Sequence, residues 1–320
     1  MLGITLGDVN GVGPDILLRA FCQGELRHPF VVYGDYSALE QCARHLRLEV
    51  KLERIGPQQI PLPGVLCIRD AGCLDSAALR PGALCAEAGA AALVYLDCAL
   101  NDACSGQIDA IVTLPVNKEG VRLTAPDFTG HTDVVARACG THDYVMTLIT
   151  DQLVVPHVTA HMSVRAALDA LCVERIATVG CLTRDVLVRL GRRGSIAVLG
   201  VNPHAGEGGA FGDEEIRVVQ PALDVLRGRG VDVAGPVPPD TAFMRALRGD
   251  FAAVICMYHD QGHIAMKTVG FDEGVNVTVG LPIVRTSVDH GTAYDIAWKG
   301  CASIQSFVNA FSLARRLALP

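Results

Sequence analysis

An apolar run that ends abruptly in polar residues is the feature that most constrains the fold of this chain. Residues 251–257 are apolar and have the length of a buried parallel strand. Histidines, acids, cations and amides are then concentrated within residues 258–295. In open α/β sheets, ligands bind at the carboxyl ends of the strands. The sequence therefore predicts a buried strand that leads directly into a functional site.

Four residues of this polar segment suit a binding or catalytic site. His259 and His263 can act as metal ligands or acid–base groups, and Lys267 and Arg285 can hold an anion. The alternative for each residue alone is a histidine that caps a strand, or a cation that lies in solvent. So many donors, acceptors and titratable groups in one short segment favour a site over that alternative.

Strand and helix patterns alternate along the rest of the chain, which is typical of a parallel or mixed sheet with helices on its faces. The predicted strands are residues 3–6, 30–33, 108–114 and 195–201, and the predicted helices include 37–46, 83–103 and 303–317. Residues 145–150 and 153–159 flank a two-residue polar link, which predicts a hairpin. The second strand of this hairpin leads to His157, for which we expect a packing role, and to His161.

Composition narrows the class of protein. A chain of 320 residues fits one large domain or two modest ones, and with 50% hydrophobic and 19% charged residues it can bury a sizeable core. The net charge of −7 argues against nucleic acid or an anionic membrane as the main partner. The sequence shows neither a signal peptide nor an apolar stretch of membrane-spanning length. The 12 scattered cysteines, without a C-x-x-C pair, indicate free thiols in a reducing cytoplasm.

Three phrases of the sequence resemble one family. They are Tyr-His-Asp-Gln-Gly at 258–262, Val-Asn-Val-Thr-Val-Gly-Leu-Pro at 275–282, and Arg-Thr-Ser-Val-Asp-His-Gly-Thr-Ala at 285–293. They are similar to signatures of the 4-hydroxythreonine-4-phosphate dehydrogenase family. The resemblance implies an α/β/α sandwich of the isocitrate/isopropylmalate dehydrogenase-like type, with two subdomains and the active-site cleft between them. We expect residues 1–125 plus 290–320 to form one subdomain and 126–289 the other.

The resemblance also implies a metal site. His161, His204 and His259 each follow a predicted strand, and all three match metal-ligand positions of the family. Taken alone, each of these histidines is better explained as a structural or loop residue. Imidazole ligands favour Zn²⁺ over Mg²⁺, Mn²⁺ or Co²⁺. In the family the ligands are gathered across a dimer interface, so a homodimer with a shared active site is expected.

The substrate and catalytic positions follow from the same resemblance. The family holds a small phosphorylated anion with the residues that correspond here to His131, Thr132, Lys267, Asn276 and Arg285. Capping a helix is the alternative role for Thr132. Asp240, Asp260 and Lys267 are candidate catalytic groups, with Asp240 also predicted as a helix N-cap and Asp260 alternatively as a partner of His259.

A dinucleotide cofactor is implied by the phrase that begins at residue 290. His290, Gly291, Thr292 and Asp295 resemble the adenosine-binding segment of the wider superfamily, which uses NAD or NADP. The chain has no Rossmann glycine fingerprint, as that fold requires none. Trp298 stands where relatives usually have glycine, and we expect its ring to reshape the adenine end of the pocket.

The leading hypothesis is a metal-dependent dehydrogenase that oxidises and decarboxylates 4-hydroxythreonine 4-phosphate in pyridoxine synthesis, with NAD or NADP as the acceptor. The alternatives are a dehydrogenase of D-erythronate or D-threonate 4-phosphate, then one of a dihydrodiol carboxylate. A non-catalytic paralogue that binds a metal or ligand is the alternative from another class. The wording around His263 and Met162 departs from the commonest biosynthetic members and keeps the sugar-acid phosphates open.

Overall fold

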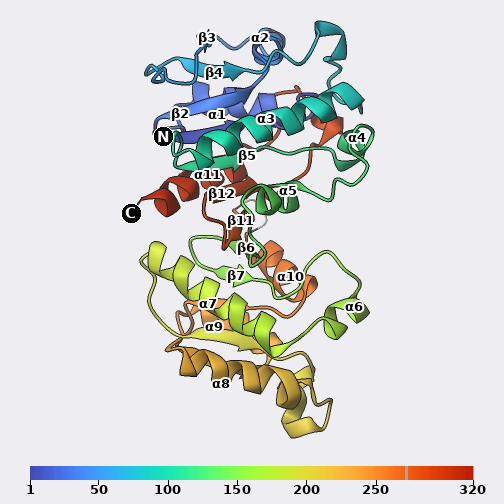
Figure 1. Cartoon of the computed structure of the whole chain (residues 1–320), viewed down its shortest axis with the longest axis vertical. Helices are drawn as coiled ribbons and strands as arrows, with labels where there is room; N and C mark the ends of the chain where they lie inside the picture. The colour runs from blue at the N-terminus through green and yellow to red at the C-terminus, as the bar shows by residue number, and fades with distance from the viewer. Residues whose placement is uncertain (271–272, 320) are drawn as a thin grey trace. The chain divides into compact units, whose positions relative to one another are not determined.

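The chain folds into two compact units. The computed structural model describes residues 1–270 and 273–319, and Figure 1 traces them from blue to red. The first unit comprises Met1–His142 and Pro282–Ala318, and the second comprises Asp143–Leu281 together with Leu319. Residues 282–289, which the sequence analysis placed in the second subdomain, belong to the first unit because β12 (Val284–Val288) pairs in parallel with β5 (Ala110–Thr113). Residues 126–142 also belong to the first unit.

A parallel sheet forms the centre of the first unit. Its strand order is β3-β4-β2-β1-β5-β12, and all five pairings are parallel. The remaining strands are β1 (Leu2–Thr5), β2 (Phe30–Gly34), β3 (Leu52–Arg54) and β4 (Leu66–Asp70). The central strands β1, β2 and β5 are buried along their whole length, as strands covered on both faces must be.

Helices cover this sheet. The helix α3 packs across β1, β2 and β5, and α11 packs on β12 and β5 (Figure 1). The hydroxyl of Thr286 on β12 donates to the Ala310 carbonyl at 2.9 Å, which fixes α11 to the strand. The helices are α1 (Gly13–Cys22), α2 (Tyr36–His45), α3 (Ala86–Cys104), α4 (Lys118–Arg122), α5 (His131–Ala138) and α11 (Gln305–Ala318), with short 3₁₀ turns at Ser76–Ala78 and Tyr294–Ile296.

The strands of the second unit form two groups. One is antiparallel in the order β11-β6-β7 and includes the predicted hairpin, which pairs β6 (Val145–Ile149) with β7 (Val154–Pro156). The other is parallel in the order β10-β8-β9. Its strands are β8 (Ile196–Leu199), β9 (Val233–Val237) and β10 (Ala253–Ile255), and β11 spans Val275–Val279. A single parallel bridge joins His157 to Cys256, so the chain after β7 runs beside the end of β10.

A core of aliphatic side chains holds the second unit together. It includes Leu148, Val155, Leu199, Val254 and Met266, which come from both sheets and from α10. The helices are α6 (Val164–Asp169), α7 (Val173–Arg189), α8 (Gln220–Gly228), α9 (Pro239–Leu247) and α10 (His259–Gly270), with a 3₁₀ segment η2 (Pro203–Gly209) and a π-helical turn η3 (Glu215–Val219).

The predicted α/β class is confirmed, because parallel strands alternate with helices in both units. Within the part of the chain that the structure describes, no helix is long and apolar enough to cross a membrane.

Candidate active site

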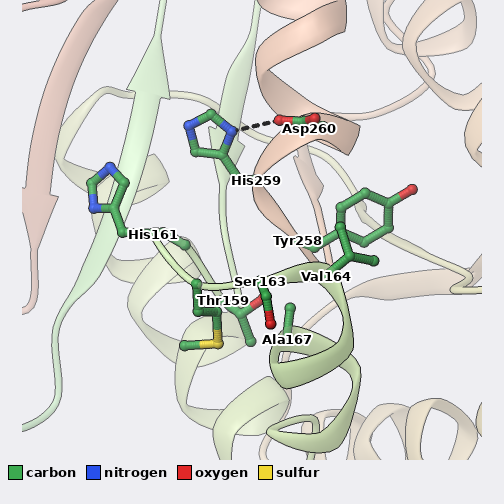
Figure 2. Close-up of a pocket in the computed structure, with 10 residues that line it drawn as sticks. Thr159, His161, Ser163, Val164, Ala167, Tyr258, His259 and Asp260 are labelled. Carbon is green, nitrogen blue, oxygen red and sulfur yellow. Dashed lines mark hydrogen bonds and ion pairs between the residues drawn. The ribbon is translucent and has the colours of Figure 1, made fainter.

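A pocket of about 490 Å³ opens where β10 ends and α10 begins. The helix α10 starts at His259, directly behind the strand, and the chain after β7 brings His161 to the same pocket (Figure 2). The other lining residues are Thr159, Ala160, Met162, Ser163, Val164, Ala167, Tyr258 and Asp260. The predicted strand at residues 251–257 therefore leads into a pocket that holds two histidines and one carboxylate together with apolar side chains.

Two predicted metal ligands lie together in this pocket. The ring centres of His161 and His259 are 5.9 Å apart. Two imidazoles that bind one zinc ion through nitrogens at about 2 Å have ring centres roughly 5–6 Å apart. In His259, Nδ1 lies 2.7 Å from Asp260 Oδ1, the contact drawn in Figure 2. Because an ionised carboxylate only accepts, Nδ1 carries the proton and the lone pair of Nε2 is left for a metal.

Two further histidines, His263 and His157, pack close to the ring of His259. The ring of His263 stacks on it, with centres 3.6 Å apart and planes 9° apart, and His157 lies 4.8 Å from His263. Burial is the main cause that lowers the pKa of His157 to about 3 and that of His263 to about 4. Both rings are therefore neutral at pH 7. His157 is 1% exposed, and its Nε2 atom has no hydrogen-bond partner among the described residues.

The donor set fits a borderline divalent ion, but one chain does not gather all three predicted ligands. His161 and His259 have the spacing that a zinc ion requires, and the contact of Nδ1 with Asp260 leaves Nε2 of His259 as the ligand atom. Within residues 1–270 and 273–319, no three histidine, cysteine or acidic side chains converge as a metal centre. His204 is exposed and lies on η2, in the loop that follows β8.

A cluster of basic side chains lies in the first unit. Arg285 on β12 is 3% exposed, and it donates to the Thr132 hydroxyl at 3.1 Å and to the Thr113 hydroxyl at 2.8 Å. Burial lowers its pKa to about 10. Burial, Arg285 and Lys118 together lower the pKa of His131 to about 3, so this imidazole is neutral. A buried guanidinium beside helix-terminal N–H groups is suited to bind an anion.

The remaining predicted residues of the second unit lie on separate elements. Lys267 is exposed in the last turn of α10. Asn276 lies on β11, and its buried Oδ1 atom has no hydrogen-bond partner within the described chain. A buried polar atom without a partner is typical of a group that binds a ligand. Asp240 is exposed in the first turn of α9, whose N-cap is Pro238, so the predicted N-cap role is wrong. Proline occupies that position, and no side chain caps the helix.

Thr132 is likewise not an N-cap. Gly130 occupies the N-cap position of α5 with φ of 158°, and Thr132 follows in the first turn. The Thr132 hydroxyl instead accepts a hydrogen bond from Arg285. This arrangement favours the anion-binding interpretation of Thr132 over the capping alternative.

The predicted cofactor phrase packs against the loop that follows β1. The Thr292 carbonyl accepts from the Val12 N–H at 3.0 Å, and the Tyr294 hydroxyl donates to Asp8 at 2.6 Å. A side chain at Gly11 would clash, because its Cβ would lie 2.8 Å from the Thr292 oxygen. His290, Gly291 and Asp295 are exposed beside this contact. Two segments that the sequence analysis treated separately therefore form one platform at the carboxyl end of β1.

Trp298 is part of the interior of the first unit. Its side chain is 3% exposed, and its indole N–H donates to the Val9 carbonyl at 3.0 Å. The ring meets His45 edge-on, with ring centres 6.1 Å apart. Trp298 has a φ of 57°, a left-handed conformation that glycine adopts without strain. The indole therefore lies on the buried side of the loop that follows β1 and supports this loop through Val9.

Comparison with known proteins decides the family. The model of the pyridoxal phosphate biosynthetic protein PdxA family matches residues 25–314. The chain belongs to this family. A D-threonate 4-phosphate dehydrogenase of Salmonella typhimurium is 42% identical to it, over 99% of this chain and 98% of that relative.

Solved structures agree with this assignment. A 4-hydroxythreonine-4-phosphate dehydrogenase from Klebsiella pneumoniae is 42% identical, with a TM-score of 0.91 over 100% of this chain and 99% of that one. A β-decarboxylating dehydrogenase from Thermococcus kodakarensis shares the fold at 14% identity, with a TM-score of 0.53 over 99% and 83% of the two chains. The predicted family, the isocitrate dehydrogenase-like fold and the activity class, a dehydrogenase acting on a CH–OH group, are confirmed.

Two residues that this PdxA-family chain brings to its candidate sites had no site role in the sequence-based prediction. His157, expected only to pack, lies 4.8 Å from His263, whose ring stacks on His259. Lys118 lies beside the anion cluster: a Cβ at Gly130 would be 3.7 Å from its ammonium nitrogen. Lys118 lies four residues after the predicted strand at residues 108–114, and this place near a strand end is the signal in the sequence that points to it.

Proposed function

We propose that this chain is a metal-dependent dehydrogenase of a 4-phosphorylated hydroxy acid, with D-threonate 4-phosphate as its preferred substrate. One observation carries the preference over 4-hydroxythreonine 4-phosphate, which has an ammonium group in place of one hydroxyl. Among the residues of 1–270 and 273–319 that line the pocket, the only carboxylate is Asp260, and its Oδ1 atom is engaged by His259. A buried ammonium needs an anionic partner, whereas imidazoles can serve a hydroxyl. The name of the Salmonella typhimurium relative also supports this choice.

The anionic groups of the substrate are assigned by the same proposal. In the first unit, Arg285, Thr132 and His131 offer donors suited to a phosphate, because a guanidinium can bind it through two N–H groups. In the second unit, the unsatisfied Asn276 Oδ1 and the cationic Lys267 suit a hydroxyl and a carboxylate. The net charge of the chain is −7, so fixed local cations have to overcome the overall repulsion of an anion.

The metal chemistry depends on His161 and His259. A bound divalent ion, with Zn²⁺ preferred, supplies a Lewis acid that favours ionisation of the substrate hydroxyl. His161 and His259 would hold the ion, and Asp260 accepts from Nδ1 of His259, so that Nε2 would be the ligand atom. Asp240 and Lys267 are proposed as the groups that move protons during oxidation and decarboxylation. His290, Gly291, Thr292 and Asp295 are the proposed contacts of NAD or NADP, which would supply the hydride acceptor.

A homodimer and a cytoplasmic location complete the proposal. His161 and His259 meet in the pocket, but no third ligand joins them among the described residues. We therefore propose that a partner subunit completes the ligand set. Free cysteines throughout the described chain are consistent with a reducing compartment. Neither a nucleic acid nor a membrane is part of the proposed function.

Steady-state kinetics with a panel of substrates tests this function. The zinc-loaded protein is assayed with NAD and with NADP on D-threonate 4-phosphate, D-erythronate 4-phosphate, 4-hydroxythreonine 4-phosphate and a dihydrodiol carboxylate. We expect the highest kcat/KM with D-threonate 4-phosphate. A higher value with 4-hydroxythreonine 4-phosphate would place the chain in pyridoxine synthesis. No turnover of any of them by the zinc-loaded protein would favour a non-catalytic metal-binding paralogue.

A further inference from the structure

The loop that carries His204 has an unusual backbone. Five consecutive residues of η2 have left-handed conformations, with φ of 53° at His204, 53° at Ala205, 79° at Gly206, 42° at Glu207 and 66° at Gly208. A residue with a Cβ atom adopts this conformation at a cost, and three of the five have one. Such a run persists only where the surrounding structure holds it in place, and strained segments of this kind concentrate at functional sites.

Glu215 is the residue that holds this loop. Its side-chain Oε1 accepts from the Val201 N–H and the Asn202 N–H, each at 2.7 Å, and Oε2 accepts from the Asn202 side-chain amide at 2.9 Å. Gly206 allows the loop to approach, because a Cβ there would lie 2.6 Å from Oε2. The carboxylate therefore fixes the chain two and three residues before His204 and lies close to it two residues after.

The carboxylate of Glu215 is charged although it is buried. The residue is 4% exposed, and burial alone would raise its pKa. The hydrogen bonds from Asn202 and Val201 outweigh burial and hold the pKa below its usual value. Glu215 also begins the π-helical turn η3, a departure from regular helix that often marks functional sites. Glu215 thus combines a buried charge with an irregular helix turn, and both lie against the loop that carries His204. Packing alone does not require either feature.

We propose that Glu215 is a positioning residue for a metal ligand: it locks the left-handed loop so that His204 presents its imidazole to a divalent ion. This inference rests on the proposed function, in which His204 is a ligand. The alternative is that Glu215 merely stabilises the fold of the second unit. The two roles differ in what they predict for metal affinity in a folded protein.

The test compares two neighbouring carboxylates that contact the same asparagine. Glu215→Gln keeps the size of the side chain but offers one oxygen to three donors, so at least one N–H faces an amide N–H. Glu214→Gln is the matched control. Among the contacts described above, Glu214 accepts one hydrogen bond, from the Asn202 side chain at 2.6 Å, and none from the backbone of the loop. Zn²⁺ affinity is measured by competition with a chromogenic chelator, and folding by circular dichroism. We expect Glu215→Gln to weaken Zn²⁺ binding about tenfold or more and Glu214→Gln to leave it within about twofold.

A second substitution separates positioning from folding. Ala205→Gly in the Glu215→Gln background relieves the left-handed strain without restoring the carboxylate. We expect it to recover most of the Zn²⁺ affinity, which a defect in core packing would not allow. A folded Glu215→Gln protein with wild-type affinity overturns the inference, and so does a double variant that shows no recovery.

Two further outcomes are informative. If the wild-type protein binds no Zn²⁺, the metal assignment of the proposed function fails, rather than this inference alone. If Glu215→Gln does not fold, Asn202→Ala takes its place, because it removes the donor at 2.9 Å and leaves the carboxylate. The two backbone contacts to Oε1 remain in this variant, so wild-type affinity in Asn202→Ala would contradict a positioning role for the Oε2 contact.

Discussion

Arg285 offers the sharpest test of the proposed phosphate contacts. Arg285→Lys keeps a positive charge but replaces a planar fork with a single ammonium. In the native protein, one arm of the fork donates to Thr132 at 3.1 Å and the other to Thr113 at 2.8 Å, while the whole side chain is 3% exposed. A lysine cannot keep both hydroxyl contacts and also bind a phosphate through two N–H groups.

The size of the effect follows from the contact that is lost. A hydrogen bond to a charged group contributes roughly 1.5–3 kcal/mol, which corresponds to about a ten- to hundredfold change in binding. We therefore expect Arg285→Lys to raise KM for D-threonate 4-phosphate by at least about tenfold. KM for D-threonate, which has no phosphate, should change much less. Zinc content should not change, because Arg285 is not a predicted ligand.

The assay measures kcat/KM for both substrates on the wild-type and variant proteins. Arg44→Lys serves as the control, because Arg44 is exposed and pairs with Glu40 on α2. Equal losses with the phosphorylated and the unphosphorylated substrate, or no loss with either, would refute the assignment of Arg285 to the phosphate. A melting temperature for each variant shows whether the buried arginine also stabilises the first unit.

Two further predictions follow from single histidines. His204 is exposed, so His204→Ala should remove stoichiometric zinc and turnover while the melting temperature stays within a few degrees; retained zinc with a normal rate would exclude His204 as a ligand. His131 has its pKa lowered from 6.5 to about 3, mainly by burial, so as pH falls the unfolded chain gains a proton before the folded chain does and stability is lost between these values. His131→Gln should reduce that loss, by at most about 1.4 kcal/mol per pH unit, in urea unfolding at pH 7 and pH 5; the same loss in both proteins would contradict the shift.

Much of the fold could be predicted from local patterns. The predicted strand at residues 30–33 is β2 (Phe30–Gly34), and the predicted helix at 303–317 is α11 (Gln305–Ala318). Hydrophobic periodicity and the two-residue hairpin link are local signals, and they were sufficient for these elements. The change from apolar strand to polar segment also located His259, because that signal lies within a few residues of the chain.

The contacts that define the candidate sites could not be predicted in the same way. His157 reaches His263 because residue 157 bridges to Cys256, and no local pattern encodes that pairing. The boundary near residue 282 depends on the register between β12 and β5 in the same way. The left-handed run at His204 depends on the buried carboxylate of Glu215, which follows several residues later. Each of these features arises from tertiary packing and not from propensity.

The pairing of β12 with β5 has a consequence for the order in which the protein is made. A ribosome synthesises β5 early, but the neighbour that covers its open edge, residues 284–288, emerges only after the whole second unit. Residues 143–281 make up nearly all of the second unit in one continuous segment, which can complete its core first. Until β12 and α11 arrive, the nascent first unit presents an unpaired strand edge of the kind that promotes aggregation. Protection of that edge during translation is therefore a requirement that the topology imposes on the cell.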